Sequence, residues 1–392
     1  MRILIITPWF PAYPDDQTGN YIFASITTLL KLGHTIKVLV TSPWRPPYAS
    51  LLHSDWRKTK IATDRFSGDL GIEIIEYISI PRNYCRILSN YLYQHRVVPA
   101  LDRIIEYYKP DIIHAHTELP GYAAVISGRK NGKPVVVTLH GLNTAERLQS
   151  GAQRRMCRKL ANFADRLIIV GPPLAEYAKS LSGRSEHIRI VPNGFSLPAG
   201  CTRPQRRPWP DVLNLISISN LHEGKGVDLT LKALNLLARD GITNWHYTVV
   251  GDGKERTHLE SLAEDMHLSH KVTFSGQATH FRVYQMLMKA HVFVLPSYRE
   301  AFGIAYLEAM ACGLLTIGVE GQGPAAFIQN ECTGLLVLPG NIDSLTKNLG
   351  KVFLEPGTMQ EIALAGQEYV FNHFTWEHHA RKLDDLYREI VQ

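Results

Sequence analysis

Cysteine is scarce in this chain of 392 residues, and its five cysteines form no Cys-x-x-Cys pair. An odd, scattered set of thiols outlines neither a disulfide framework nor a zinc site, and fits a reduced cytosolic protein. No hydrophobic run approaches the ~20 residues that a membrane span needs. Residues 1–8 carry one cation and a short apolar run without a small-residue cleavage site, so we expect a first β-strand there and no signal peptide.

Acidic residues are under-represented in the first half of the chain. Residues 1–200 contain 25 Lys and Arg against 15 Asp and Glu, a balance of +10, whereas residues 201–392 contain 17 against 21, a balance of −4. A basic half suits an anionic partner, such as the cytoplasmic leaflet of a membrane or a lipid pyrophosphate. A solvated basic surface without a partner is the alternative. Nucleic acid is disfavoured because no nucleic-acid-binding motif is present.

Two stretches of the basic half combine cations with aromatic residues or with a helical pattern. The first carries Tyr91, Tyr93, Tyr107 and Tyr108 with Arg82, Arg86, Arg96 and Arg103, and the second, on an expected helix, carries Arg154, Arg155, Arg158 and Lys159. A membrane interface favours both aromatic rings and cations. An ordinary solvated helix face is the alternative for both stretches.

Apolar strand-like runs alternate with helical patterns along the whole chain, which predicts an α/β fold with parallel sheets. Strands are expected at 2–7, 35–41, 72–77, 111–115, 134–139, 166–170, 187–191, 213–219, 246–250, 272–275, 291–295, 314–318 and 335–337. Helices are expected between them, among others at 20–33, 97–108, 121–131, 228–240, 256–267, 281–289 and 304–312. The chain has no short-period repeat and no low-complexity tract.

The composition changes at residues 198–211, which are rich in proline and arginine and suit neither a sheet interior nor a long helix. We therefore predict an N-terminal domain over 1–197, a C-terminal domain over 198–374 and a final helical segment over 375–392. Two Rossmann-like domains facing across a cleft are expected, because open α/β sheets bind ligands at the carboxyl ends of their strands. The final segment has apolar residues at helical spacing, namely Ala380, Leu383, Leu386, Tyr387 and Ile390.

The most informative segment places two glutamates, Glu300 and Glu308, eight positions apart between a strand and a helix. Glu300 is expected on the loop after strand 291–295, and Glu308 inside helix 304–312. Residues 302–304 would form the helix N-terminus, whose free N–H groups and positive dipole end suit a phosphate. Carboxylates beside such a site can accept hydrogen bonds from sugar or ribose hydroxyls.

This Glu-x7-Glu segment resembles the donor-sugar motif of the retaining glycosyltransferases of family 4, and the likeness covers nearly the whole chain. The resemblance implies the GT-B fold, with the acceptor held mainly by the first domain, the nucleotide-sugar donor by the second, and a C-terminal helix that crosses back to the first domain. It also implies that Glu300 binds donor-sugar hydroxyls, helped by the N–H groups of Phe302, Gly303 and Ile304, and that Glu308 holds the ribose hydroxyls.

A glycine-flanked lysine, Lys225, follows strand 213–219 on a loop that opens a helix. Gly224 and Gly226 let the backbone come close to a diphosphate, and Lys225 supplies positive charge. The family carries an arginine five residues before this lysine, where this chain has Asn220. Asparagine can donate hydrogen bonds but cannot offset phosphate charge. We therefore expect Lys225 to carry most of the charge, helped by a cation from elsewhere.

Two further loops follow strands of the first half. Gly19 precedes a helix where the family usually has two glycines that approach the donor diphosphate and the acceptor. His140 ends strand 134–139, and the resemblance places such a histidine near the donor sugar, where it could bind a hydroxyl. His114 and His116 end another strand, where they line the cleft, contact the acceptor or simply pack.

Three glycine loops of the second half carry weaker signals. Gly321-Gln322-Gly323-Pro324 leads to Ala325, where the family often has an acid, so we assign no role to that position. Its glycines still permit backbone N–H groups to approach the donor. Gly251-Asp252-Gly253 resembles the family's Gly-x-Gly, which is a common turn. Ser275-Gly276-Gln277 lies in a region that commonly touches the nucleotide base in the family.

The chain contains no Asp-x-Asp, the motif with which metal-dependent glycosyltransferases of the other major fold hold a divalent ion. We expect no metal and no cofactor. The helix N-terminus near Gly303 and the ammonium of Lys225 would stabilise the leaving diphosphate instead.

The sequence thus predicts a cytosolic, membrane-associating glycosyltransferase that moves a sugar from a UDP- or GDP-sugar, with retention, to a lipid-linked or polysaccharide acceptor. Cell-surface glycan synthesis (lipopolysaccharide, capsule or exopolysaccharide) is the expected setting. The predicted catalytic residues are His140, Glu300 and Lys225, and the predicted donor-binding residues are Gly19, Asn220, Lys225, Glu300, Phe302, Gly303, Ile304 and Glu308. The alternatives are a nucleotide-sugar epimerase or hydrolase on the same fold, and a catalytically silent nucleotide-sugar-binding subunit.

Overall fold

A computed structural model describes residues 1–12, 16, 18–44, 70–79, 86–141, 151–198, 200–205 and 208–391 of the chain. The chain divides into two compact units, each built on one parallel sheet. Unit 1 comprises Met1–Val170, Leu174–Pro192 and His379–Gln392, and unit 2 comprises Gly171–Pro173 and Asn193–His378. Arg82, Cys85 and the side chain of Arg86 lie outside the described part of the chain.

The sheet of unit 1 has the order β3-β2-β1-β4-β5-β6-β7. Its strands are β1 (Arg2–Thr7), β2 (Thr35–Pro43), β3 (Leu70–Tyr77), β4 (Ile112–His116), β5 (Val135–Leu139), β6 (Arg166–Ile169) and β7 (Ile188–Ile190). All neighbours are parallel, and β4 and β5 are buried along their whole length. Strands buried along their whole length form where helices cover both faces of a parallel sheet. The strand order reverses between β1 and β4, which is where ligands bind in open α/β sheets.

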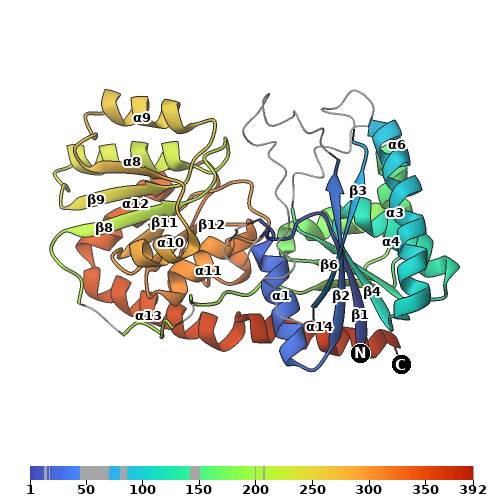
Figure 1. The fold of residues 1–392 in the computed structure, drawn as a ribbon. Helices are drawn as coiled ribbons and strands as arrows, with labels where there is room; N and C mark the ends of the chain where they lie inside the picture. The colour runs from blue at the N-terminus through green and yellow to red at the C-terminus, as the bar shows by residue number, and fades with distance from the viewer. Residues whose placement is uncertain are drawn as a thin grey trace. The chain divides into compact units, whose positions relative to one another are not determined.

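Helices of unit 1 lie on both sides of this sheet (Figure 1). On one face, α1 (Asn20–Lys31) and α14 (Trp376–Val391) share a buried core with the strands. The other helices, α3 (Arg86–Tyr108), α4 (Glu118–Lys130), α6 (Gly151–Phe163) and α7 (Ala175–Ser182), pack side by side as a second layer. The 3-10 turn η3 (Pro172–Leu174) precedes α7, and its two prolines are counted with unit 2.

The prediction for helix 97–108 is wrong at its N-terminal end, because α3 already begins at Arg86. Pro99 lies inside the helix, where it removes one backbone hydrogen bond. Tyr93, Val97 and Leu101 are buried on either side of the proline. Their burial against the sheet maintains the helix through a residue that the local pattern treats as a helix start.

The sheet of unit 2 has the order β10-β9-β8-β11-β12-β13 and reverses between β8 and β11. Its strands are β8 (Leu213–Ile218), β9 (Trp245–Val250), β10 (Val272–Gly276), β11 (Val292–Val294), β12 (Leu315–Val319) and β13 (Leu335–Val337). Its helices are α8 (Val227–Arg239), α9 (Arg256–Asp265), α10 (His280–Leu287), α11 (Ile304–Ala311), α12 (Ile342–Leu354), α13 (Pro356–His373) and the 3-10 turn η4 (Gly323–Ala326).

The predicted α/β fold with two Rossmann-like sheets is confirmed, and the strands lie within about two residues of their expected positions. From His379 onward, α14 belongs to unit 1, where Ala380, Leu383, Leu386 and Tyr387 are buried. The division of roles between domains 1–197 and 198–374 stays a prediction. Within the described residues, no helix is both long and apolar enough to cross a membrane.

Candidate active site

The loop between β8 and α8 carries Lys225 between two glycines with left-handed backbones. Gly224 has φ +93° and Gly226, the N-cap of α8, has φ +74°, a region that glycine adopts without strain. A Cβ atom on Gly226 would lie 2.3 Å from the carbonyl oxygen of Pro296. Glycine therefore lets this loop pack directly against the loop that follows β11.

The two loops are joined by an ion pair between Lys225 and Glu300. The Nζ atom of Lys225 lies 2.8 Å from Oε2 of Glu300, and the two side chains are 25% and 17% exposed. The pair is thus partly shielded from water, so its electrostatic attraction is stronger than that of a fully exposed pair. Both groups remain open enough for a ligand to reach them.

The backbone of Glu300 is held by the loop after β12. The N–H group of Glu300 donates a hydrogen bond to Oε1 of Gln322 at 3.1 Å, and the N–H group of Gly323 donates to the carbonyl oxygen of Glu300 at 2.8 Å. A Cβ atom on Gly323 would lie 2.4 Å from the backbone of Phe302. The N–H group of Gly323, which we expected near the donor, is thus used to hold the glutamate loop.

Helix α11 begins directly after this loop, with Gly303 as its N-cap at φ +92°. A Cβ atom on Gly303 would lie 2.6 Å from the ring of Tyr306. Phe302 is buried against Phe327, and Ile304 is partly buried. Within the described part of the chain, the N–H groups of residues 302–304 have no hydrogen-bond partner. They form a set of donors at the positive end of the helix dipole.

Glu308 lies on the second turn of α11 and pairs with a residue that the sequence analysis missed. Nε2 of His280, the first residue of α10, lies 2.9 Å from Oε1 of Glu308. The hydrogen bond to Glu308 raises the pKa of His280 above its usual value. The available signal was a histidine at a helix start soon after a strand, which is too common to assign a role.

Asn220 is exposed at the end of β8, and its carbonyl oxygen accepts a hydrogen bond from the N–H group of His222. The sequence analysis also passed over Arg299, a cationic residue that lies beside the loop of Lys225. The Cδ atom of Arg299 lies 3.3 Å from the place that a Cβ atom of Gly224 would take. A second cationic side chain thus runs along the Lys225 loop.

The predicted donor residues of unit 2 therefore come together at the carboxyl edge of its sheet, around the switch between β8 and β11. An ammonium group, free N–H groups at a helix start and two carboxylates converge there. The first two can neutralise and bind an anion, and carboxylates can accept hydrogen bonds from hydroxyls. The arrangement fits a ligand that combines phosphate groups with sugars.

Gly19 and His140 lie at the carboxyl edge of the sheet of unit 1, beside Trp9. Gly19 has φ +71°, and a Cβ atom on it would lie 2.6 Å from the carbonyl group of Trp9. The ring of His140 lies 6.5 Å from that of Trp9 and 4.9 Å from that of Tyr21. Burial lowers the pKa of His140 to about 3, so this imidazole is neutral near pH 7.

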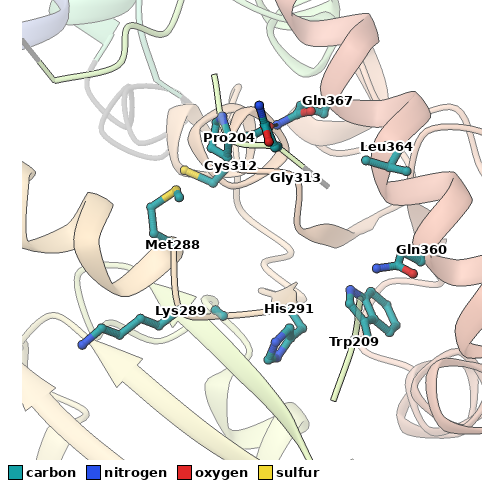
Figure 2. A pocket seen from close by; sticks show the side chains of 12 residues that line it. Pro204, Trp209, Met288, Lys289, His291, Cys312, Gly313, Gln360, Leu364 and Gln367 are labelled. Carbon is teal, nitrogen blue, oxygen red and sulfur yellow. Dashed lines mark hydrogen bonds between the residues drawn. The ribbon is translucent and has the colours of Figure 1, made fainter. Parts of the chain in front are cut away.

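A cavity of about 90 Å³ lies elsewhere in unit 2, lined by Trp209, Met288, His291, Gln360 and Gln367 among others (Figure 2). His291 precedes β11, so the cavity stands at the amino edge of the sheet, opposite the edge that carries Glu300. Ligand pockets usually measure about 300–1,000 Å³. The cavity is too small for a nucleotide sugar, and Gln367 there contacts Pro204 and Ala311 of neighbouring segments.

Metal ligands do not cluster in the described ranges, where no three His, Cys, Asp or Glu side chains are placed to share an ion. Cys157, Cys201, Cys312 and Cys332 have free thiols.

Two family models match the chain and together span most of it. The model of Glycosyltransferase Family 4 matches residues 18–197, and that of Glycosyl transferases group 1 matches residues 204–369. With its two parallel-sheet units, the chain belongs to glycosyltransferase family 4 and has the GT-B fold.

Individual relatives agree with this assignment. The chain is 25% identical to a glycogen synthase of Mycobacterium tuberculosis, over 96% of this chain and 92% of that protein. It is also 25% identical to the putative teichuronic acid biosynthesis glycosyltransferase TuaC of Bacillus subtilis, over 100% and 99% of the two chains. The crystal structure of Anabaena HepE in complex with UDP superposes with a TM-score of 0.72 at 18% identity, over 99% of this chain and 100% of that chain, which shows the same fold.

Proposed function

We propose that the protein transfers a sugar from a UDP- or GDP-sugar to a lipid-linked or polysaccharide acceptor, with retention of the anomeric configuration. The observation that carries the proposal is the Lys225–Glu300 pair beside the free N–H groups of α11. UDP in the HepE crystal structure supports a nucleotide-diphosphate donor. The name of TuaC supports a role in making a cell-surface glycan.

In this proposal each group at the carboxyl edge of unit 2 binds one part of the donor. Lys225 and Asn220 bind the diphosphate, the N–H groups of Phe302, Gly303 and Ile304 bind the phosphate or the sugar, and Glu300 accepts hydrogen bonds from sugar hydroxyls. Glu308 accepts hydrogen bonds from the ribose hydroxyls. In unit 1, we assign Gly19 and His140 to the binding of the sugar and the acceptor.

The proposed transfer is a same-face substitution at the anomeric carbon. The bond from this carbon to the diphosphate oxygen breaks, and a bond to the acceptor hydroxyl oxygen forms on the same face. The proton of that hydroxyl passes to the departing phosphate oxygen, which serves as the base. Lys225 and the start of α11 stabilise the negative charge of the leaving group, so no metal ion is required in this scheme.

The test is an assay of the purified protein with a panel of UDP- and GDP-sugars, with and without glycan or lipid-linked acceptors. The proposal requires that a glycoside product forms only when acceptor is present and that NMR shows it to have the anomeric configuration of the donor. The product must still form in the presence of EDTA. A free sugar or an epimer formed without acceptor would favour a hydrolase or an epimerase. Nucleotide-sugar binding without turnover of any donor would favour a silent binding subunit.

We further propose that unit 1 docks on the anionic cytoplasmic face of a membrane. Arg154, Arg155, Arg158 and Lys159 are all exposed on α6, whose opposite face is buried. Ile87 and Tyr91 of α3, in the same unit, are 67% and 63% exposed, so unit 1 carries exposed apolar side chains as well as exposed cations. This combination suits a lipid interface.

Liposome sedimentation tests the docking. Replacing Arg154, Arg155, Arg158 and Lys159 by glutamine should abolish binding to vesicles rich in anionic lipid at low salt, because the electrostatic attraction is lost. The basic cluster is a solvated surface if the unaltered protein sediments no better with anionic than with zwitterionic vesicles.

A further inference from the structure

Three histidine rings form a row on the face of the first sheet that α1 and α14 cover. His114 and His116 occupy alternate positions of β4, so their side chains point to the same face. Their ring centroids lie 4.5 Å apart at an interplanar angle of 30°. The ring of His140, which follows β5, stacks on His116 with centroids 5.1 Å apart and an angle of 22°. The row ends at the carboxyl edge, beside Tyr21 and Trp9.

Hydrogen bonds use most of the ring nitrogens in this row. Nδ1 of His116 lies 2.8 Å from Nε2 of His140. Nε2 of His114 lies 2.7 Å from Oγ1 of Thr138, and Nδ1 of His114 lies 2.5 Å from the hydroxyl oxygen of Tyr387 on α14. Both nitrogens of His114 and the Nε2 atom of His140 are therefore engaged within the protein.

The Nδ1 atom of His140 is buried and has no hydrogen-bond partner among the described residues. An unmatched buried polar atom costs about 1–3 kcal/mol, and such atoms in native proteins call for an explanation. Because Nε2 of the same ring is held by His116, Nδ1 is the nitrogen of His140 that still needs a hydrogen-bond partner.

The backbone next to His116 is strained. Thr117 has φ 73° and ψ 172°, a conformation found essentially only for glycine, and its N–H group donates to the carbonyl oxygen of Thr138 at 2.9 Å. Strain of this kind costs about 1–3 kcal/mol and persists where the surrounding structure holds it in place. The chain thus holds a distorted turn directly after the residue that contacts His140.

All three imidazoles are neutral at physiological pH. Burial lowers the pKa values of His114 and His140 to about 3 and that of His116 well below its usual value. A neutral imidazole has one N–H donor and one acceptor nitrogen. If His116 donates to Nε2 of His140, then Nδ1 of His140 carries the proton, and if His140 donates, Nδ1 is the acceptor. The hydrogen bond from His116 thus decides which role Nδ1 plays.

We propose that His116 is a positioning residue whose hydrogen bond to Nε2 of His140 fixes the tautomer and orientation of that ring, so that Nδ1 is the atom offered to a substrate hydroxyl. The proposal rests on the proposed function, in which His140 contacts the sugar or the acceptor. His116 itself touches no substrate. In many proteins a second side chain fixes the tautomer of a histidine by a hydrogen bond to one ring nitrogen, while the other nitrogen binds a ligand or takes part in catalysis.

Three variants separate positioning from packing. His116→Phe keeps a ring in the stack but removes the hydrogen bond to His140. His116→Asn places an amide near the former Nδ1 atom and can restore the hydrogen bond. Tyr387→Phe, the matched control, removes a hydrogen bond at the far end of the row and leaves the contact between His116 and His140 in place.

The first readout is the tautomer of His140 in the free protein, from 15N NMR of labelled histidines, with the His140 signals assigned by their loss in His140→Phe. We expect one tautomer in the unaltered protein, in His116→Asn and in Tyr387→Phe, and a mixture in His116→Phe. Adding nucleotide sugar and acceptor to the unaltered protein should shift the Nδ1 signal of His140. An Nδ1 signal that no substrate moves overturns the proposal, even if His116→Phe fails to fold.

The second readout is steady-state transfer. His116→Phe should lower kcat about 10-fold with little change in KM for the donor, the size expected for one misplaced hydrogen-bonding group, while His116→Asn stays within about 3-fold. Unchanged kcat or an unchanged His140 tautomer in His116→Phe overturns the proposal. If even the unaltered protein transfers no sugar, the proposed function fails, and the NMR measurements still decide the role of His116.

Discussion

The Nζ atom of Lys225 lies 2.8 Å from Oε2 of Glu300, so the cation and the carboxylate that we assign to the donor neutralise each other across two loops of unit 2. In the proposed function, a diphosphate bound to Lys225 would weaken this pair and free Glu300 to accept hydrogen bonds from sugar hydroxyls. The diphosphate and the sugar of the donor would then be recognised together, because binding of the diphosphate to Lys225 releases Glu300 for the sugar, and binding of the sugar to Glu300 releases Lys225 for the diphosphate.

Replacing Lys225 by methionine should lower kcat by about 10²–10³-fold, because the ammonium group that stabilises the negative charge on the leaving diphosphate is lost. The loss is measured as initial rates of transfer at saturating donor. Lys232→Met is the matched control, because Lys232 forms a partly exposed pair with Asp228 one turn away along α8. Equal losses in the two variants would mean that Lys225 acts only through general charge.

A double-mutant cycle should reveal the coupling of Lys225 and Glu300. Glu300→Gln alone is expected to reduce kcat/KM strongly, because the amide accepts fewer hydrogen bonds from the sugar and leaves Lys225 unpaired. Groups in direct contact typically show interaction energies of about 0.5–3 kcal/mol. Additive effects of Lys225→Met and Glu300→Gln on kcat/KM would contradict a joint role.

Gly303→Ala should both destabilise the protein and reduce transfer. The residue has φ +92°, and its Cβ atom would meet the ring of Tyr306 at 2.6 Å, so the start of α11 would have to move. Gly241→Ala separates backbone strain from steric contact, because Gly241 has φ +88° but open space where its Cβ atom would lie. Both variants should unfold at lower temperature in circular dichroism, with only Gly303→Ala losing donor affinity in calorimetry.

The stability of the protein should depend on pH through His280. Its hydrogen bond to Glu308 raises its pKa in the folded chain. The contribution is fully present below the unfolded value of about 6.5 and is lost as the pH rises through the folded pKa. Between pH 6 and 9, urea denaturation should show a decline in unfolding free energy that His280→Gln does not share. Parallel curves for the two proteins would rule out this coupling.

Acid should destabilise unit 1 through its buried neutral histidines. His379 contacts Ser25 and the carbonyl oxygen of Pro192, and burial lowers its pKa to about 4. The unfolded chain takes up a proton below about pH 6.5 and the folded chain does not, so stability falls as the pH drops toward 4, by up to about 1.4 kcal/mol per pH unit for one such group. His379→Gln should reduce that slope in urea denaturation between pH 6 and 5. An unchanged slope would place the acid sensitivity elsewhere.

The fold could be predicted from the sequence because local signals agree with the tertiary structure. The buried strand β5 is an almost entirely apolar run, and Gly19, Gly226 and Gly303 stand at the helix starts where the chain needs positive φ. Each of these signals lies within a few neighbouring residues. Helix α3 is the exception, because its continuation through Pro99 depends on packing against the sheet.

The neighbourhood of the candidate site was only partly predictable. Lys225 and Glu300 were expected on loops after strands and Glu308 inside the following helix, as the structure has them, but their neighbourhoods also include residues of distant segments. Neither the ion pair of Glu308 with His280 nor the stem of Arg299 along Gly224 has a local sequence signature. The hydrogen bond between Nδ1 of His116 and Nε2 of His140 likewise depends on the pairing of β4 with β5.

Helix α14 has a consequence for how the chain is made. The side chains that complete the core of unit 1, including Leu383 and Tyr387, leave the ribosome only after all of unit 2. Domains generally fold in order of synthesis. Here the first part of the chain to be made lacks α14, which follows unit 2 in the sequence, so the apolar face that α14 covers stays uncovered in nascent unit 1 until that helix has been made.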